Sequence, residues 1–193
     1  LDHCILRASD LDPLVTRAAA AAGVQHEAVS VVFSHTHAAG LLGTDRVEMP
    51  GGDLIPAYLE SLYQAIEDLA GRAVSQLAPV KLVYGEGFCD LARQRDLWDS
   101  ESNQYVCGFN PEQDADNTLL VVKLQDAGGA WAGSIINYGC HPTSLAWENR
   151  LISPDYPGAM RELVEQQTGA PCLFIQGICG DLGPRDGYSG DPE

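Results

Sequence analysis

Short apolar runs alternate along this chain of 193 residues with segments whose apolar residues recur at helical spacing. The clearest helical segment extends from Asp53, a candidate N-cap, to Leu77, and Pro79 ends it. Two further helices are predicted over residues 12–22 and 155–169, the second with Asp155 as its candidate N-cap, and each ends at a glycine. Helices that alternate with apolar strands predict an α/β domain. Six runs are predicted to form strands: residues 4–6, 28–33, 80–84, 118–124, 131–138 and 172–175.

The sheet of this domain is expected to be mixed. Residues 126–129, Asp-Ala-Gly-Gly, separate two predicted strands and are typical of a β-hairpin turn, which makes those two strands antiparallel. The predicted fold is therefore a mixed β-sheet flanked by helices, with the functional site at the carboxyl ends of the strands. We expect residues 1–193 to form a single domain that is truncated at both ends. Leu1 lies just before a predicted strand, and no closing element precedes Glu193.

The charge balance excludes some classes of partner. The chain has 11 Lys and Arg against 27 Asp and Glu, which gives a formal net charge of −16. Because such a surface repels phosphate groups, binding of nucleic acid or of an anionic membrane through a basic patch is excluded as a main function. No apolar run approaches the roughly 18 residues of a membrane span, so no transmembrane segment is predicted. The oligomeric state is left open.

The six cysteines include no Cys-x-x-Cys pair, so neither a zinc finger nor a thioredoxin-like motif is predicted. Four of them lie in or beside apolar runs, where a free cysteine behaves as a small hydrophobic residue. This usage favours a reducing compartment such as the cytoplasm, and the expected truncation of the N-terminus leaves export open.

Three predicted strands lead directly into glycine-containing segments with reactive side chains. These segments are Phe-Ser-His-Thr-His-Ala-Ala-Gly (33–40), Asn-Tyr-Gly-Cys-His-Pro-Thr-Ser (137–144) and Gln-Gly-Ile-Cys-Gly-Asp-Leu-Gly-Pro-Arg-Asp (176–186). In open α/β sheets, ligand sites gather outside the carboxyl ends of the strands. The three segments are therefore expected to converge on one site.

Histidines in these segments predict a metal site. His35 and His37 are two residues apart, so on an extended segment both imidazoles project to the same side and can meet one ion. His141, at the end of another strand, is the natural third nitrogen. The alternative is that one or two of these histidines are ordinary polar residues at strand ends.

Several hydrolase and nucleotide-binding classes are excluded by their motifs. A metallo-β-lactamase pattern needs Asp and His where this chain has Ala39 and Gly40, and a TIM-barrel amidohydrolase needs two further histidines downstream, where only His141 remains. The sequence has no Gly-x-Ser-x-Gly elbow, no Walker A loop and no Gly-x-Gly-x-x-Gly fingerprint.

Taken in order, four motifs resemble one known family. They are Ser-His-Thr-His (34–37), Cys-His-Pro-Thr-Ser (140–144), Leu-Ile-Ser-Pro-Asp-Tyr-Pro-Gly (151–158), and Gln-Gly with Gly-Asp-Leu-Gly-Pro-Arg (176–177 and 180–185). Together they resemble the N-terminal catalytic domain of the neutral/alkaline ceramidase family. The resemblance implies a zinc-dependent amidase that cleaves the N-acyl bond of a lipid amide, ceramide.

The resemblance also implies roles for individual residues. His35 and His141 match the family's zinc-binding histidines, and His37 matches a polar catalytic group beside the metal. Arg95, in Gln-Arg-Asp, matches an arginine of an Asn-Arg-Ser-like segment that reaches the site. Gly183 stands where the family has its candidate nucleophilic serine, and the family's remaining zinc ligands, a Glu and a Tyr, come from beyond Glu193.

The sequence thus predicts a zinc-dependent hydrolase of a small-molecule or lipid amide, acting through a metal-activated water. In this mechanism His37 orients or deprotonates the water and Arg95 stabilises the oxyanion. Asp181 is a candidate for orienting a zinc-binding histidine, or else a turn residue. Because Gly183 lacks a hydroxyl group, the alternative is a non-catalytic relative that binds a metal or ligand. A phosphoesterase-like metal site is a third reading, which the shortage of Asp at the strand ends argues against.

Overall fold

The computed structural model describes residues 1–145 and 149–187, and these form two compact units. The helical unit comprises Leu1, Ile5–Val32 and Leu41–Ala78. The sheet unit comprises Asp2–Cys4, Phe33–Gly40 and the described residues of Pro79–Glu193. The expectation of a single domain over residues 1–193 stays a prediction.

The helical unit is built on two helices, α1 (Ala8–Ala22) and α2 (Ile55–Ser75), that pack against one another. Short 3₁₀ turns lie at His26–Ala28, Thr44–Arg46 and Gly52–Leu54. Leu14 and Leu59 are the most deeply buried leucines of this interface. Arg17 adds a two-pronged ion pair to Glu60, with N–O distances of 2.8 and 2.9 Å.

The predicted helices are confirmed, with corrected starts for the first two. α2 follows the 3₁₀ turn that contains Asp53, and its N-cap is Leu54, so the prediction of Asp53 as the cap was wrong. α1 begins four residues before the predicted start because the carbonyl of Arg7 accepts from the amides of Asp10 and Leu11. Gly23 ends α1 in the left-handed conformation (φ 66°), as expected of a helix C-cap.

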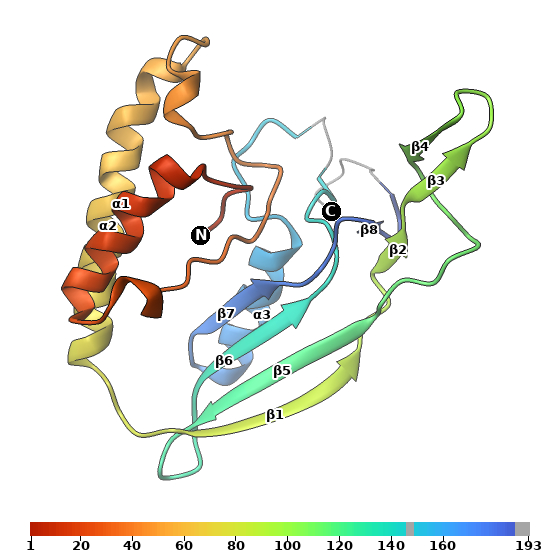
Figure 1. The fold of residues 1–193 in the computed structure, drawn as a ribbon. Coiled ribbons are helices and arrows are strands. Elements are labelled where there is room, and N and C mark those ends of the chain that lie inside the picture. The colour runs from red at the N-terminus through yellow and green to blue at the C-terminus, as the bar shows by residue number, and fades with distance from the viewer. Residues whose placement is uncertain (146–148, 188–193) are drawn as a thin grey trace. The chain divides into compact units, whose positions relative to one another are not determined.

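The sheet unit contains a four-stranded sheet of order β1-β5-β6-β7 (Figure 1). β1 (Lys81–Phe88) pairs antiparallel with β5 (Thr118–Gln125), which pairs antiparallel with β6 (Trp131–Tyr138). β7 (Cys172–Gln176) is parallel to β6, and α3 (Tyr156–Thr168) connects the two and packs on β7. The predicted mixed sheet flanked by helices is confirmed, as is the hairpin, whose turn is held by Asp126 Oδ1 accepting from the amides of Gly128 and Ala130.

Two small ladders that the sequence did not predict extend this sheet unit. β2 (Ala92–Gln94) pairs with β8 (Leu182–Pro184), and β3 (Asp96–Asp99) pairs with β4 (Gln104–Cys107). The main core cluster joins the β2–β8 ladder to the ends of β6 and β7: Ala92, Tyr138, Cys140, Phe174, Cys179 and Leu182. The hydroxyl of Tyr138 accepts from the amides of Leu91 and Ala92 and donates to the carbonyl of Cys89. This core supports the loops that carry the site.

The strands predicted at residues 4–6 and 28–33 are wrong. The backbone there is irregular, although the amino group of Leu1 donates to Val32 O and the His35 amide donates to His3 O. A strand needs a neighbour to complete its ladder, and two such bonds do not make a regular one. In the described part of the chain, none of the helices combines the length and apolarity needed to span a bilayer.

Candidate metal centre

Three histidines from two distant segments lie together in the sheet unit. The ring centroids of His35, His37 and His141 form a triangle with sides of 4.7, 5.1 and 5.2 Å. Backbone hydrogen bonds hold the segments, since the His37 amide donates to Pro142 O at 3.2 Å and the His141 amide donates to Leu182 O at 3.3 Å. The expected convergence of these segments is observed.

The backbone conformation of His35 differs from the extended one that the sequence predicted. Its φ of 64° lies in the left-handed region, which is unusual for a residue with a side chain. The segment is therefore not extended at His35, and the argument that alternate residues share one face does not explain why His35 and His37 meet. Backbone strain of this kind persists only where its surroundings enforce it, and it is common at functional sites.

The hydrogen bonds of His35 and His141 determine which nitrogen of each ring carries the proton. His35 Nδ1 lies 3.0 Å from the carbonyl oxygen of Cys4, and His141 Nδ1 lies 2.8 Å from that of Cys179. Because a carbonyl only accepts, both Nδ1 atoms donate, and in a neutral imidazole Nε2 then holds a lone pair. The two Nε2 atoms face one another at 3.1 Å. Two lone pairs at this distance repel unless a proton or a metal cation lies between them.

The electrostatic surroundings keep two of the histidines neutral. Burial lowers the pKa of His141 to about 4, with smaller contributions from the charges of Arg95 and the other two histidines, against the hydrogen bond to Cys179, which raises it. Partial burial first, then the charges of His35 and Arg95, lower the pKa of His37. Neutral imidazole is the form that binds a metal.

Cys4 offers a further potential ligand beside His35. The thiol of Cys4 and ring nitrogens of His35 and His37 lie within 4.8 Å of one another. However, Cys4 Sγ is 3.6 Å from His35 Nδ1, the nitrogen that donates to the Cys4 carbonyl. Burial also raises the pKa of the Cys4 thiol, which disfavours the thiolate that metals bind. The pair of facing Nε2 atoms is therefore the better candidate for holding a cation.

Arg95 follows β2 and is anchored on the loop before β8. Its Nε and Nη2 donate to the Gly180 carbonyl at 3.0 and 2.8 Å, and its amide donates to Asp181 O. Asp181 does not orient a histidine as one reading expected, because its carboxylate accepts from Gln94 Nε2 at 2.7 Å and His141 Nδ1 donates to Cys179 instead. The catalytic role of Arg95 stays a prediction.

Sequence reasoning missed a clamp that joins the two histidine segments. On one side, Thr36 Oγ1 donates to Ser153 O at 2.8 Å and the Ser153 amide donates to Ala38 O. On the other side, the buried carboxylate of Asp155 accepts from the hydroxyl and amide of Ser144 and from the amide of Leu145 at 3.2 Å. Asp155 also caps α3 through the Tyr156 amide, which was the only role predicted for it.

The chain is similar to parts of known proteins. No protein-family model matches the chain. It is 32% identical to the neutral ceramidase of Pseudomonas aeruginosa over 134 residues, which are 67% of this chain and 19% of that protein. It is 26% identical to neutral ceramidase A of Dictyostelium discoideum over 182 residues, which are 83% of this chain and 24% of that protein.

Two solved structures have a similar fold. A ceramidase complexed with C2 superimposes with a TM-score of 0.67 and 26% identity, over 95% of this chain and 29% of the other. The neutral ceramidase of Pseudomonas aeruginosa superimposes with a TM-score of 0.66 over 94% of this chain and 31% of the other, and its 22% identity supports the fold alone. The chain spans less than a third of each relative. In sequence and in fold, it is a neutral ceramidase-like domain.

Proposed function

We propose that this chain carries part of the zinc site of a ceramidase-like hydrolase that cleaves an amide bond. The observation that carries the proposal is the pair of Nε2 atoms of His35 and His141, which face one another at 3.1 Å while both Nδ1 atoms donate to carbonyls. The resemblance to proteins named neutral ceramidase supports the amide as the bond that is cleaved.

The spacing of the two nitrogens fits a shared zinc ion. Nitrogen ligands lie about 2.0–2.1 Å from zinc, so two ligands of one tetrahedral ion lie about 3.3 Å apart. The carbonyl partners of the two Nδ1 atoms resemble the hydrogen bonds that commonly fix the tautomer of metal-binding histidines. Bound by His35 and His141, zinc would supply Lewis-acid chemistry, which polarises a carbonyl and acidifies a water molecule.

The chain's own residues then have separate tasks. His37 lies at the exposed edge of the cluster, with its ring 5.1–5.2 Å from the other two, so its neutral ring can accept a proton from a water molecule there. Arg95 keeps one guanidinium nitrogen, Nη1, beyond those that bind Gly180, and it can donate to an oxyanion as the carbonyl is attacked. The rings of His35 and His141 are fixed by their carbonyl partners.

The alternative is a relative that binds the metal or a ligand without turnover, and Gly183 is the residue that favours it. Gly183 is buried in β8 and provides no hydroxyl group, so this position cannot supply a nucleophile. A lipid amide such as ceramide is the substrate class that the names of the relatives suggest.

A turnover screen on zinc-loaded protein that carries the complete zinc site separates the two functions. We expect release of fatty acid from N-acyl amides, and loss of that activity in His37→Ala. His26→Ala is the matched control, because His26 is an exposed histidine of the helical unit that pairs with Asp12. Full zinc binding without turnover of any amide or ester would overturn the proposal that the protein is a hydrolase, and it would favour a relative that binds the metal without catalysis.

A further inference from the structure

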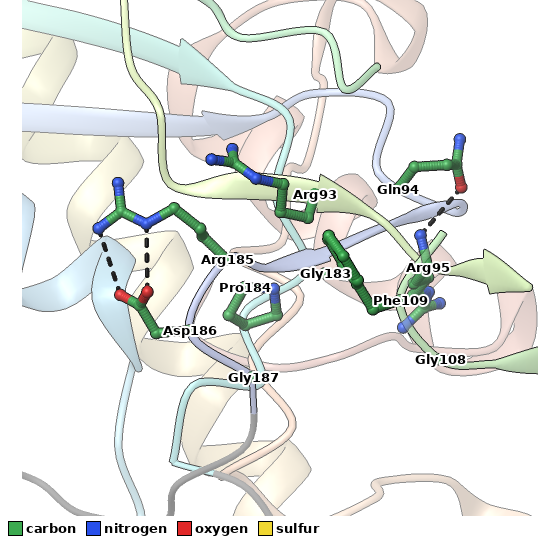
Figure 2. Close-up of a pocket in the computed structure, with 10 residues that line it drawn as sticks. All are labelled: Arg93, Gln94, Arg95, Gly108, Phe109, Gly183, Pro184, Arg185, Asp186 and Gly187. Carbon is green, nitrogen blue, oxygen red and sulfur yellow. Dashed lines mark hydrogen bonds and ion pairs between the residues drawn. The ribbon is translucent and has the colours of Figure 1, made fainter. Parts of the chain in front are cut away.

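A pocket lined by arginines lies on the β2–β8 ladder (Figure 2). Its volume is about 280 Å³, and the side chains of Arg93, Arg95 and Arg185 lie around Gly183 and Phe109. Three of the chain's 11 Lys and Arg thus surround one small cavity in a molecule of net charge −16. We call this cavity the arginine pocket.

The positive charges of the arginine pocket are not all paired with carboxylates. Asp90 forms ion pairs with Arg93 and Arg185, and Asp186 forms a second one with Arg185. Arg95 forms no ion pair in the part of the chain that the structure describes, and its guanidinium rests on a neutral acceptor, the Gly180 carbonyl. Asp181, whose carboxylate accepts from the lining residue Gln94, is a third acidic group nearby, so the three positive charges are balanced overall. Arg95 is the guanidinium that has no carboxylate partner among the described residues, and an anion is the complementary ligand for it.

The rest of the lining limits what the anion is attached to. Phe109 is 55% exposed and provides an apolar wall, while Gly108 and Gly183 present backbone without a side chain. A pocket of about 280 Å³ is slightly smaller than those that enclose a whole drug-sized ligand, at about 300–1,000 Å³. It therefore suits one charged group of a larger ligand.

The arginine pocket adjoins the candidate metal centre through β8. Leu182 O accepts from the His141 amide at 3.3 Å, and the next residue, Gly183, lines the pocket. A ligand in the pocket thus lies against β8, the strand that also holds the backbone of the His141 segment.

We propose that the arginine pocket binds an anionic group next to the amide of the substrate, so that the preferred substrates are N-acyl amino acids or similar anionic amides. This inference rests on the proposed function, which supplies the cleaved amide. A carboxylate is favoured over a bulkier anion because planar guanidinium groups match it with two parallel hydrogen bonds and the cavity is small.

Binding of matched short-chain amides to the 193-residue chain tests the proposal without turnover. The probes are N-hexanoylglycine, its neutral isostere N-hexanoylglycinamide, and N-hexanoyl-aminomethylphosphonate, measured by calorimetry at low and high salt. We expect the glycine compound to bind about tenfold more tightly than the glycinamide, and the preference to shrink as salt rises. A stronger preference for the phosphonate would assign the pocket to phosphate-type anions instead of carboxylates.

Two variants that each remove one arginine charge show whether the preference for the carboxylate arises in the arginine pocket. Arg93→Gln should reduce the preference for the carboxylate severalfold, whereas Arg72→Gln, an exposed arginine in α2, should leave it unchanged. Equal binding of the glycine and glycinamide compounds to the unmodified chain would overturn the proposal, whatever the variants do. If that chain nevertheless binds zinc and cleaves neutral amides, the proposed function stands and the pocket alone is reassigned.

Discussion

Replacement of Asp155 tests the clamp between the two histidine segments. Its carboxylate accepts hydrogen bonds from the hydroxyl and amide of Ser144 and from the amides of Leu145 and Tyr156. Its backbone, at φ 56° and ψ −156°, lies in a region that is essentially restricted to glycine. The structure therefore contains both a stabilising side chain and a strained backbone at one residue.

The two contributions predict different stabilities for two substitutions of Asp155. In Asp155→Ala, loss of the cap costs about 1 kcal/mol and the unpaired buried amides cost about 1–3 kcal/mol, so we expect destabilisation of about 3 kcal/mol. Asp155→Gly loses the same hydrogen bonds but relieves strain of about 1–3 kcal/mol. The glycine variant should therefore be more stable than the alanine variant by at least about 1 kcal/mol, although glycine usually destabilises.

Urea unfolding followed by tryptophan fluorescence measures both effects in the sheet unit. Trp98 and Trp131 lie in that unit, and the sequence of the helical unit contains no tryptophan. Zinc affinity should fall in both variants, because the clamp sets the positions of the segments that carry His37 and His141. Equal stability of the two variants would refute the claim of backbone strain at Asp155. A decrease of less than about 0.5 kcal/mol in the free energy of unfolding of Asp155→Ala would refute the claim that its carboxylate stabilises the clamp.

Three further predictions concern other parts of the fold. Gly52→Ala should destabilise the helical unit strongly, because a Cβ at this position would lie 2.1 Å from Arg46 O. Gly71→Ala, which has open space around its Cβ in α2, should instead stabilise the unit by about 0.5–1 kcal/mol. Thermal unfolding followed by circular dichroism measures both variants, and equal effects would contradict the packing described. Tyr138→Phe leaves the amides of Leu91 and Ala92 without their acceptor and should cost about 1–3 kcal/mol in urea unfolding, a prediction that a neutral effect would contradict. Burial raises the pKa of Cys140 to about 12, so a thiol reagent at pH 8 should modify the exposed Cys107 and leave Cys140 intact in the folded chain. Mass spectrometry of the labelled peptides measures both modifications, and faster modification of Cys140 than of Cys107 would contradict the prediction.

Elements with a clear period were predictable from sequence. α2 shows helical spacing over its length, the β5–β6 hairpin carries its turn residues, and α3 has a cap at Asp155 and a stop at Gly169. The strands predicted at residues 4–6 and 28–33 are absent from the structure, because an apolar run indicates burial and does not show that a partner strand is present. The β2–β8 ladder escaped prediction because strands of three residues are too short to show alternation.

The candidate site was predictable in its residues and not in its geometry. His35, His37 and His141 were selected by motif and order, and the structure brings them together. Neither the left-handed backbone of His35 nor the carbonyl partners that orient the rings could be read from the sequence, because both depend on residues distant along the chain, such as Cys179. Asp155 was read as a helix cap because a cap needs only its own neighbours, whereas its contacts to Ser144 and Leu145 depend on tertiary structure.

Zinc binding by protein that carries the complete zinc site tests the central claim most directly. After zinc loading, the protein is dialysed against low zinc, and metal per chain is measured for the unmodified protein, His141→Ala and the control His26→Ala. We expect about one equivalent of zinc for the unmodified protein and the control, and less than about half an equivalent for His141→Ala. An unmodified chain that retains less than about half an equivalent, or a His141→Ala variant that retains a full one, would contradict a cation held between His35 and His141.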